Sequence, residues 1–411
     1  MYVEPDPLPS ERLFRTNGGG YARYQTPPVK KPRDRYWLHL LLFFLTLAAT
    51  VQAGGTWAGR TLVYEEAGLS AYILDGLRFA VALLLFLTVH EFGHYFAARR
   101  HGVDTSLPYY IPAPFIGIGT FGAVIRIREP IPSTRKLFDI GAAGPLAGFV
   151  VALGILLYAL ATLPPPDYIF DLGGHEGLKA YIRQYGTFPD HILPADPGTE
   201  GLRLVVGQTP LFWFLSQFFA NVPPMYELYH YPVLFAGWLG LFFTALNLLP
   251  VGQLDGGHVL YALVGPKWHS RLAHGFFMLL LVSGAIGFMN TEDALLEGLH
   301  GWGGPALAWL LLSAILFVYL NRVFKGEHRV IAPVLLGIIL LVALSQWVGP
   351  PMQQFGYTGW LVFSLLLAFL VRVEHPPVLY AEPLTPGRRV LGYLCIAIFF
   401  GCFSLTPLYF V

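Results

Sequence analysis

Long apolar stretches dominate the sequence, and their length is a stronger signal than their periodicity. An α-helix needs about 20 mostly apolar residues to cross a hydrocarbon layer of ~30 Å. Nine stretches qualify as candidate spans, covering residues 36–53, 71–98, 137–163, 232–264, 271–289, 304–321, 330–349, 356–372 and 389–410. The sequence therefore predicts an all-α, multi-pass membrane protein with about nine transmembrane helices.

Prolines are expected to shorten or interrupt two of these spans, and one further apolar run is too short to be a span. Pro407 lies near the end of the last stretch, so its final turn is expected to leave the helix. Pro250 is expected to interrupt the fourth stretch, and the carbonyl groups that it releases must face protein or water rather than lipid. The run Leu211–Ala220 is too short to cross, and we expect it at the interface or against the bundle.

The segment 107–128, between the second and third stretches, is too rich in glycine and proline for a helix, and its end alternates like a strand. It predicts a re-entrant or interfacial β-hairpin whose edge would pair with an extended substrate by strand addition. The alternative is a surface hairpin without a role in substrate binding. The sequence leaves both interpretations open.

Composition narrows the class of protein further. Only 12% of the 411 residues are charged, about half the share found in soluble domains. This excludes an ordinary soluble enzyme and a disordered chain, and the net charge of +1 gives no basic footprint for nucleic acid. With only two cysteines, a disulfide scaffold and a cysteine-based zinc module are also excluded.

Basic residues predict the orientation, because they favour the cytoplasmic side of a membrane. Residues 1–35 form a basic, flexible tail that is expected in the cytoplasm, ahead of a transmembrane domain over 36–410. Alternation then puts the loop 165–230 and the C-terminus outside, and His175, Glu176 and His191 become solvated residues of that outer loop. The basic residues expected inside are Arg99, Arg100, Arg126, Arg128, Arg135, Lys136, Arg322, Lys325, Arg329, Arg372, Arg388 and Arg389.

The second apolar stretch contains His90-Glu91-Phe92-Gly93-His94. Ionisable groups inside a span are costly and indicate function. Residues four apart share a helix face, so His90 and His94 can grip one Zn²⁺. Glu91 points away by about a quarter turn, which suits a base acting on water. The alternative is a buried His–Glu pair that lines a water cavity or a proton pathway.

A third ligand is expected from a distant part of the chain. Asp255 follows a long apolar stretch without any other carboxylate, and Gly256 and Gly257 allow the backbone to bend there. His258 is the competing ligand, and spacing alone does not decide between the two. From the residues alone, Asn247 is more typical of an interhelical hydrogen-bond partner than of a substrate clamp.

Together these motifs resemble the site-2 protease family of intramembrane zinc metalloproteases. The resemblance rests on the His-Glu motif, on Asn247-x-x-Pro250-x-x-x-Leu254-Asp255-Gly256-Gly257, and on Gly144-Pro145-Leu146-Ala147-Gly148 between them. It covers roughly residues 70–265. The later His375-Pro376-Pro377 resembles the chloroplast and bacterial branch that lacks a PDZ domain, and no insertion of PDZ size is seen.

The resemblance implies a peptidase that cuts transmembrane or membrane-proximal segments of protein substrates within the lipid bilayer. It makes His90, His94 and Asp255 the ligands of one zinc ion per chain and Glu91 the general base. Asn247 would position the substrate peptide or the oxyanion. The rival hypothesis is a membrane transporter or metal-handling protein that uses the same ligands without proteolysis. Glu91 separates the two, because a transport site has little use for a non-ligating base.

Overall fold

The computed structural model describes residues 13–15, 21–23, 34–60, 68–115, 117–189, 193, 204–291 and 303–410. The chain divides into two compact units, residues 1–38 and 39–411. In the first unit, β1 (Leu13–Arg15) pairs antiparallel with β2 (Tyr21–Arg23). Most of the predicted tail 1–35 lies outside the described residues. Everything below concerns the second unit.

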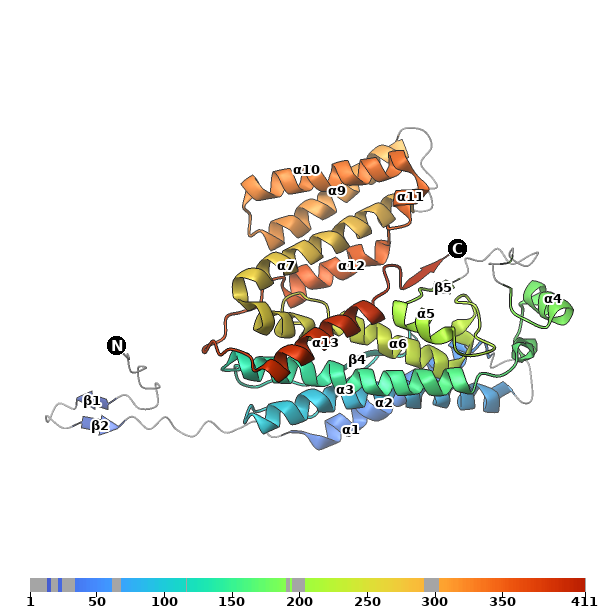
Figure 1. Ribbon diagram of the computed structural model, residues 1–411, viewed down its shortest axis with the longest axis horizontal. Coiled ribbons are helices and arrows are strands. Elements are labelled where there is room, and N and C mark those ends of the chain that lie inside the picture. Colours follow the sequence, from blue (N-terminus) through green and yellow to red (C-terminus); the bar gives the residue numbers. More distant parts are fainter. Residues whose placement is uncertain are drawn as a thin grey trace. The chain divides into compact units, whose positions relative to one another are not determined.

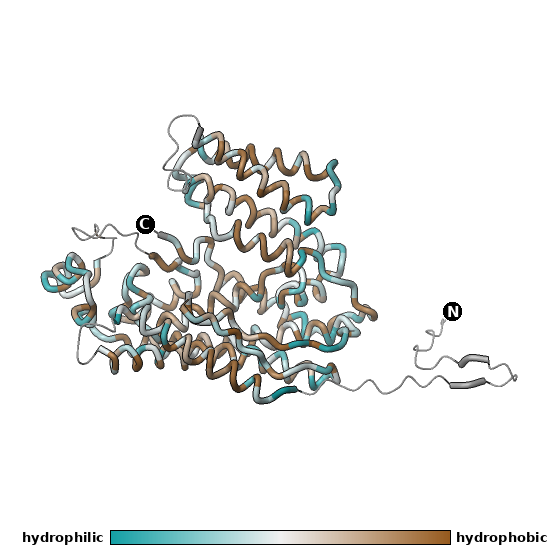
Figure 2. Tube along the Cα trace, turned by 180° about the vertical axis from the view of Figure 1, so that it is seen from behind, coloured by the Kyte–Doolittle hydropathy of each residue, from teal (hydrophilic) through white to brown (hydrophobic). Residues whose placement is uncertain are grey.

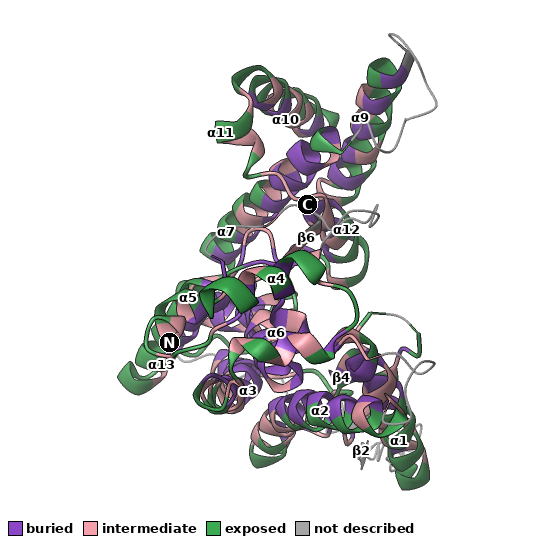
Figure 3. Cartoon of the chain, turned by 90° about the vertical axis from the view of Figure 1, so that its right-hand side faces the viewer, coloured by how far each residue is buried: buried purple, intermediate pink, exposed green. Residues whose placement is uncertain are grey.

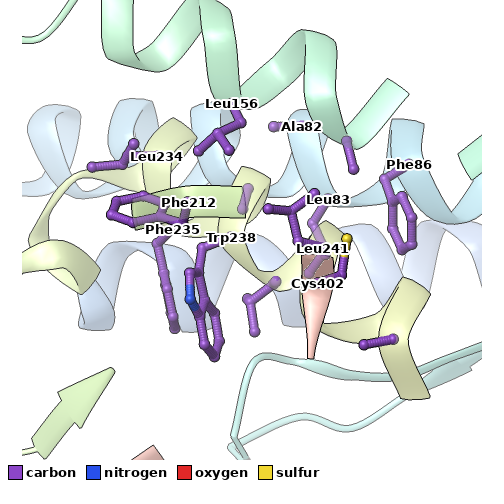
Figure 4. Close-up of a cluster of buried hydrophobic side chains, with 14 of the residues drawn as sticks. Ala82, Leu83, Phe86, Leu156, Phe212, Leu234, Phe235, Trp238, Leu241 and Cys402 are labelled. Atoms are coloured by element: carbon purple, nitrogen blue, oxygen red, sulfur yellow. The ribbon is translucent and has the colours of Figure 1, made fainter. Parts of the chain in front are cut away.

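The first half of this unit packs around three helices, α2, α3 and α6, which contact one another pairwise (Figure 1). Their buried side chains form one large cluster in which α2 contributes Phe79, Leu83 and Phe86. Leu156 of α3 and Phe235, Trp238 and Leu241 of α6 complete its centre (Figure 4). The helices that precede or form this cluster are α1 (Tyr36–Trp57), α2 (Gly68–Arg100), α3 (Thr134–Ala161) and α6 (Pro232–Asn247).

The second half packs around α7, which contacts α9, α10 and α12 and also reaches α3 of the first half. Its buried side chains form a separate hydrophobic cluster. Figure 3 shows exposed faces on the outer sides of α10 and α13. The elements are α7 (Asp255–Asn290), α9 (Gly303–Val323), α10 (His328–Val348), α11 (Pro350–Gln353), α12 (Thr358–Leu366), the π-helical turn η4 (Leu367–Val371) and α13 (Pro386–Cys402).

The described residues are mostly helical, as predicted, and short strands occur at the connections. Within the segment 107–128, β3 (Tyr109–Pro112) pairs antiparallel with β4 (Thr120–Val124), which shows a hairpin but not its position relative to a membrane. A further two-stranded sheet joins β5 (Leu204–Val206) to β6 (Leu408–Phe410). These segments carry the glycines and prolines that break helices. The remaining short elements are η2 (Pro166–Asp171), α4 (Glu176–Tyr185), α5 (Pro210–Ser216) and η3 (Leu228–His230).

The helices identify an integral membrane protein, although the predicted count of nine spans is not confirmed. Among the described residues, seven helical segments are long and apolar enough to cross a membrane. Figure 2 shows hydrophobic residues along these helices. Helices α6 and α13 have only 16 and 17 residues, or about 24–26 Å of helix. The apolar stretches in the sequence are longer than these two helices, because the turns that follow the helices are also apolar.

Two helix ends also differ from the predicted ends of the spans. The predicted span 232–264 ends at Asn247, three residues before Pro250, and α7 begins only at Asp255. Helix α7 then bends at Gly265, where φ is 79°, next to Pro266. The interruption at Pro250 is therefore confirmed. At the other end of the chain, α13 stops at Cys402, before Pro407, and the residues beyond it contribute β6.

The connections predicted to lie inside meet at one end of the unit. Arg388 donates two hydrogen bonds to Asp139 of α3, at 2.8 and 2.7 Å. Residues 372–385, named here the 372–385 segment, pair through Tyr380 with Ser133 and Thr134 at the start of α3. The outer-loop strand β5 instead pairs with β6 near the C-terminus.

Trp238 is expected to be a main contributor to the stability of α6. Its side chain is fully buried, and its indole N–H donates to the Gly207 carbonyl at 3.0 Å. Trp238→Ala should lower the free energy of unfolding by about 3–5 kcal/mol, because it leaves a cavity and an unpaired carbonyl. Thermal unfolding in detergent measures this. Trp213→Ala on α5, where the side chain is 54% exposed, is the control and should change little.

Candidate metal centre

Three ligand atoms converge between α2 and the start of α7. Nε2 of His90 and Nε2 of His94 lie 3.1 Å apart. Oδ2 of Asp255 lies 3.2 Å from His94 Nε2 and 3.4 Å from His90 Nε2. Ligands bound tetrahedrally to zinc at ~2.0–2.1 Å are separated by about 3.3 Å. The donor set and its spacing therefore fit a zinc ion, and both imidazoles are buried.

Asp255 reaches this point through a tight turn. Helix α6 ends at Asn247, and residues 248–254 reverse the chain before α7 begins. A Cβ at Gly256 would collide with the Leu248 carbonyl, so the close approach of the turn to the helix requires glycine. The 372–385 segment braces the turn, since Gly252 donates its N–H to the Val373 carbonyl at 3.0 Å.

His94 is oriented by α3. Its Nδ1 lies 2.7 Å from the Ile140 carbonyl, so Nδ1 carries a proton and the lone pair of Nε2 faces the other ligand atoms. Helix α3 can approach this closely because residue 144 is glycine. A Cβ there would overlap Nε2 of His94. This contact gives a physical reason for the first glycine of the Gly144-Pro145 motif.

Glu91 lies beside the three ligand atoms without joining them. Its carboxylate is largely buried, and Oε2 accepts the Ile125 N–H at 3.0 Å. Ile125 directly follows β4, and β4 lines one side of a cavity of about 390 Å³ that also contains His90, Glu91 and Asp255. The predicted hairpin and the His-Glu motif therefore share one cavity.

The remaining candidates line the same cavity. Asn247 Nδ2 lies 3.4 Å from His90 Nε2. His258, the competitor of Asp255, is outside the group of three, and its Nδ1 lies 2.8 Å from Nε2 of His375. His375 thus meets α7 from the 372–385 segment. The contacts of Ile125 and Ile140 use backbone groups, which are present at every position, so they could not be predicted from residue types.

The region that contains these residues matches a known protein family. The model of peptidase family M50 matches residues 78–282, a range that contains His90, Glu91, His94, Asn247 and Asp255. This region belongs to peptidase family M50. Over this region, the resemblance to the site-2 protease family that was expected from the motifs is confirmed.

Plant proteins resemble the M50 region and its surroundings. The chain is 31% identical over 199 residues to "Probable zinc metalloprotease EGY2, chloroplastic" of Oryza sativa subsp. indica, covering 48% of this chain and 31% of the relative. It is 28% identical over 327 residues to "Probable zinc metalloprotease EGY1, chloroplastic" of Arabidopsis thaliana, covering 76% and 51%. The chain thus spans about a third to a half of these relatives. No solved structure matches it.

Gly144→Ala tests the packing of α3 against the ligands. The new methyl group would displace His94, so metal affinity is expected to fall about 10–100-fold, as for other losses of ligand support. Titration of the metal-stripped protein with Zn²⁺ measures the change. Gly154→Ala on the same helix is the matched control, because a Cβ there meets open space. Equal affinities in the two variants would show that His94 does not hold metal in this position.

Proposed function

We propose that the protein is an intramembrane zinc metalloprotease that hydrolyses peptide bonds in transmembrane or membrane-proximal segments. One zinc ion per chain would be held by His90, His94 and Asp255. The observation that carries this proposal is the convergence of these three ligand atoms at 3.1–3.4 Å beside the buried, non-ligating Glu91. The printed names of the M50 relatives, which call them zinc metalloproteases, support the choice of metal.

The residues of the cavity divide the chemistry between them. When bound, zinc supplies Lewis-acid chemistry, which acidifies water and polarises a carbonyl. Glu91 takes the proton from the attacking water and returns it to the leaving amine. Its hydrogen bond to the Ile125 N–H keeps the carboxylate at the edge of the cavity. Asn247, 3.4 Å from His90 Nε2, donates its side-chain amide to the substrate backbone.

A helical substrate hides its carbonyl groups in hydrogen bonds and must unwind before attack. The free edge of β4 would receive the unwound segment. Successive N–H groups of a strand point to opposite edges. Arg126 directs its N–H to Ser106 and Ile125 directs its N–H to Glu91. Ala123, two residues before Ile125, therefore turns its N–H and carbonyl toward the cavity, where an added strand would pair.

The proposed orientation follows the sequence. The tail 1–35 lies in the cytoplasm, and the domain 36–410 crosses the membrane nine times if α6 and α13 are counted as short spans. The hairpin β3–β4 re-enters the membrane from the cytoplasmic side. The loop 165–230 and the C-terminus lie outside. Hydrogen bonds from Arg135 to Pro383 and from Arg388 to Asp139 support a common side for the basic ends.

Glu91→Gln is the central test. The amide is nearly the same size as the carboxylate but accepts no proton, so cleavage should fall at least about 100-fold while the zinc content stays unchanged. Membrane proteomics of cells with either form should reveal transmembrane fragments that accumulate only with the variant. Metal analysis of the purified proteins gives the second readout.

Glu327→Gln, an exposed carboxylate at the start of α10, is the matched control and should behave as the wild type. Cleavage that persists in Glu91→Gln would sink the proposed mechanism. If both the wild type and Glu91→Gln bind zinc but neither cleaves a substrate, the result would instead favour the transporter hypothesis.

Ala123→Pro tests strand addition at β4. Proline removes the one N–H that faces the cavity from this position, so cleavage should fall about 10-fold or more while zinc content is kept. Ala123→Gly retains the N–H and is the matched control. If proline and glycine variants cleave equally well, the free edge of β4 does not bind the substrate backbone.

A further inference from the structure

A second group of three potential ligands lies far from the M50 cavity, in the loop predicted to be outside. Nε2 of His175 is 3.1 Å from Nε2 of His230. Oε2 of Glu227 is 3.4 Å from the first and 3.6 Å from the second. We propose that His175, Glu227 and His230 bind a second divalent transition-metal ion of the zinc class. This inference is independent of the proposed proteolytic function.

The two clusters match in composition and size. Each has two imidazole nitrogens and one carboxylate oxygen, and the separations are 3.1–3.4 Å in one and 3.1–3.6 Å in the other. Among the described residues, these are the two groups of histidine, cysteine or acidic side chains whose ligand atoms converge in this way. Two imidazoles and a carboxylate suit zinc and its neighbours better than calcium or magnesium.

The hydrogen bonds of the two rings orient both lone pairs into the cluster. Nδ1 of His175 lies 2.9 Å from the Gly173 carbonyl, and Nδ1 of His230 lies 3.0 Å from the Trp57 carbonyl. A carbonyl only accepts, so each Nδ1 carries the proton. In neutral rings, both Nε2 atoms then present lone pairs to each other and to Glu227. A shared cation relieves that repulsion, and backbone anchoring of the distal nitrogen is typical of metal-binding histidines.

The surrounding backbone is shaped to hold this arrangement. His175 precedes α4 in a left-handed conformation, with φ 64°. Glu227 precedes the turn η3 and His230 is its last residue, and this turn leads directly into α6. Both are buried, at 4% and 6% exposure, whereas the side chain of His175 is 23% exposed. The metal would enter from the His175 side, which is the more exposed side of the cluster.

Such an ion would join two segments that are distant in sequence, the start of α4 and the turn before α6. His230 is hydrogen-bonded to the end of α1 through Trp57. His175 belongs to the outer loop, and Glu227 lies at the entry to α6, whose other end carries Asn247. The site would therefore fasten the outer loop to the helix that carries one wall of the M50 cavity.

Zinc binding by the full-length protein in detergent tests the proposal. The variant His90→Ala/His94→Ala removes the predicted ligands in the M50 cavity and should still bind one zinc ion per chain after stripping and reloading. Adding His175→Ala should abolish this binding. His175 is chosen because it is partly exposed, so its loss leaves the packing around His230 in place. Glu176→Gln, the exposed neighbouring carboxylate, is the control and should retain the ion.

Thermal unfolding with and without Zn²⁺ provides a second measurement, which also shows whether each variant is folded. Zn²⁺ should raise the melting temperature of the His90→Ala/His94→Ala protein and leave that of the His175→Ala-containing protein unchanged, because only a ligand of the folded state stabilises it. Co²⁺ in the same site should give the intense visible bands of tetrahedral coordination. Zinc that neither binds to nor stabilises the His90→Ala/His94→Ala protein overturns the proposal and identifies the cluster as a proton-sharing hydrogen-bond network.

Discussion

Ionisable groups buried within apolar helices must be compensated by one another, and this constraint organises the core of the protein. An isolated charge in hydrocarbon is prohibitively costly, whereas two imidazoles and a carboxylate around one cation are mutually stabilising. Their convergence requires α2, α3 and the start of α7 to approach closely. Gly144 gives α3 that proximity, and the turn between α6 and α7 brings Asp255 to the same point.

The cavity also draws on distant parts of the chain. His375 contacts His258, and Val373 accepts the N–H of Gly252 in the turn before Asp255. Both belong to the 372–385 segment, which also pairs with the start of α3. This histidine pair lies beside the three candidate ligands and outside their group.

Sequence patterns predicted those features that depend only on nearby residues of the chain. Helical periodicity alone put His90 and His94 on one face, and Pro250 alone marked the break before Asp255. The choice between Asp255 and His258 depends on how α7 faces α2, and nothing in their spacing encodes that. Span ends were misjudged where the turn residues Leu248, Leu249 and Val251 are as apolar as the helix before them. His175 was expected to be solvated, because its partner His230 lies 55 residues away. His191, assigned the same way, lies outside the described residues.

The 372–385 segment lies outside the region that the family model matches. The family match ends at residue 282, about ninety residues before this segment begins. A protein shortened to the matched region would keep every candidate ligand and base, yet it would lose the backbone contacts that brace the turn before Asp255 and the start of α3. The region that matches the family therefore lacks contacts that hold the candidate metal centre, and the 372–385 segment belongs to the scaffold of that site.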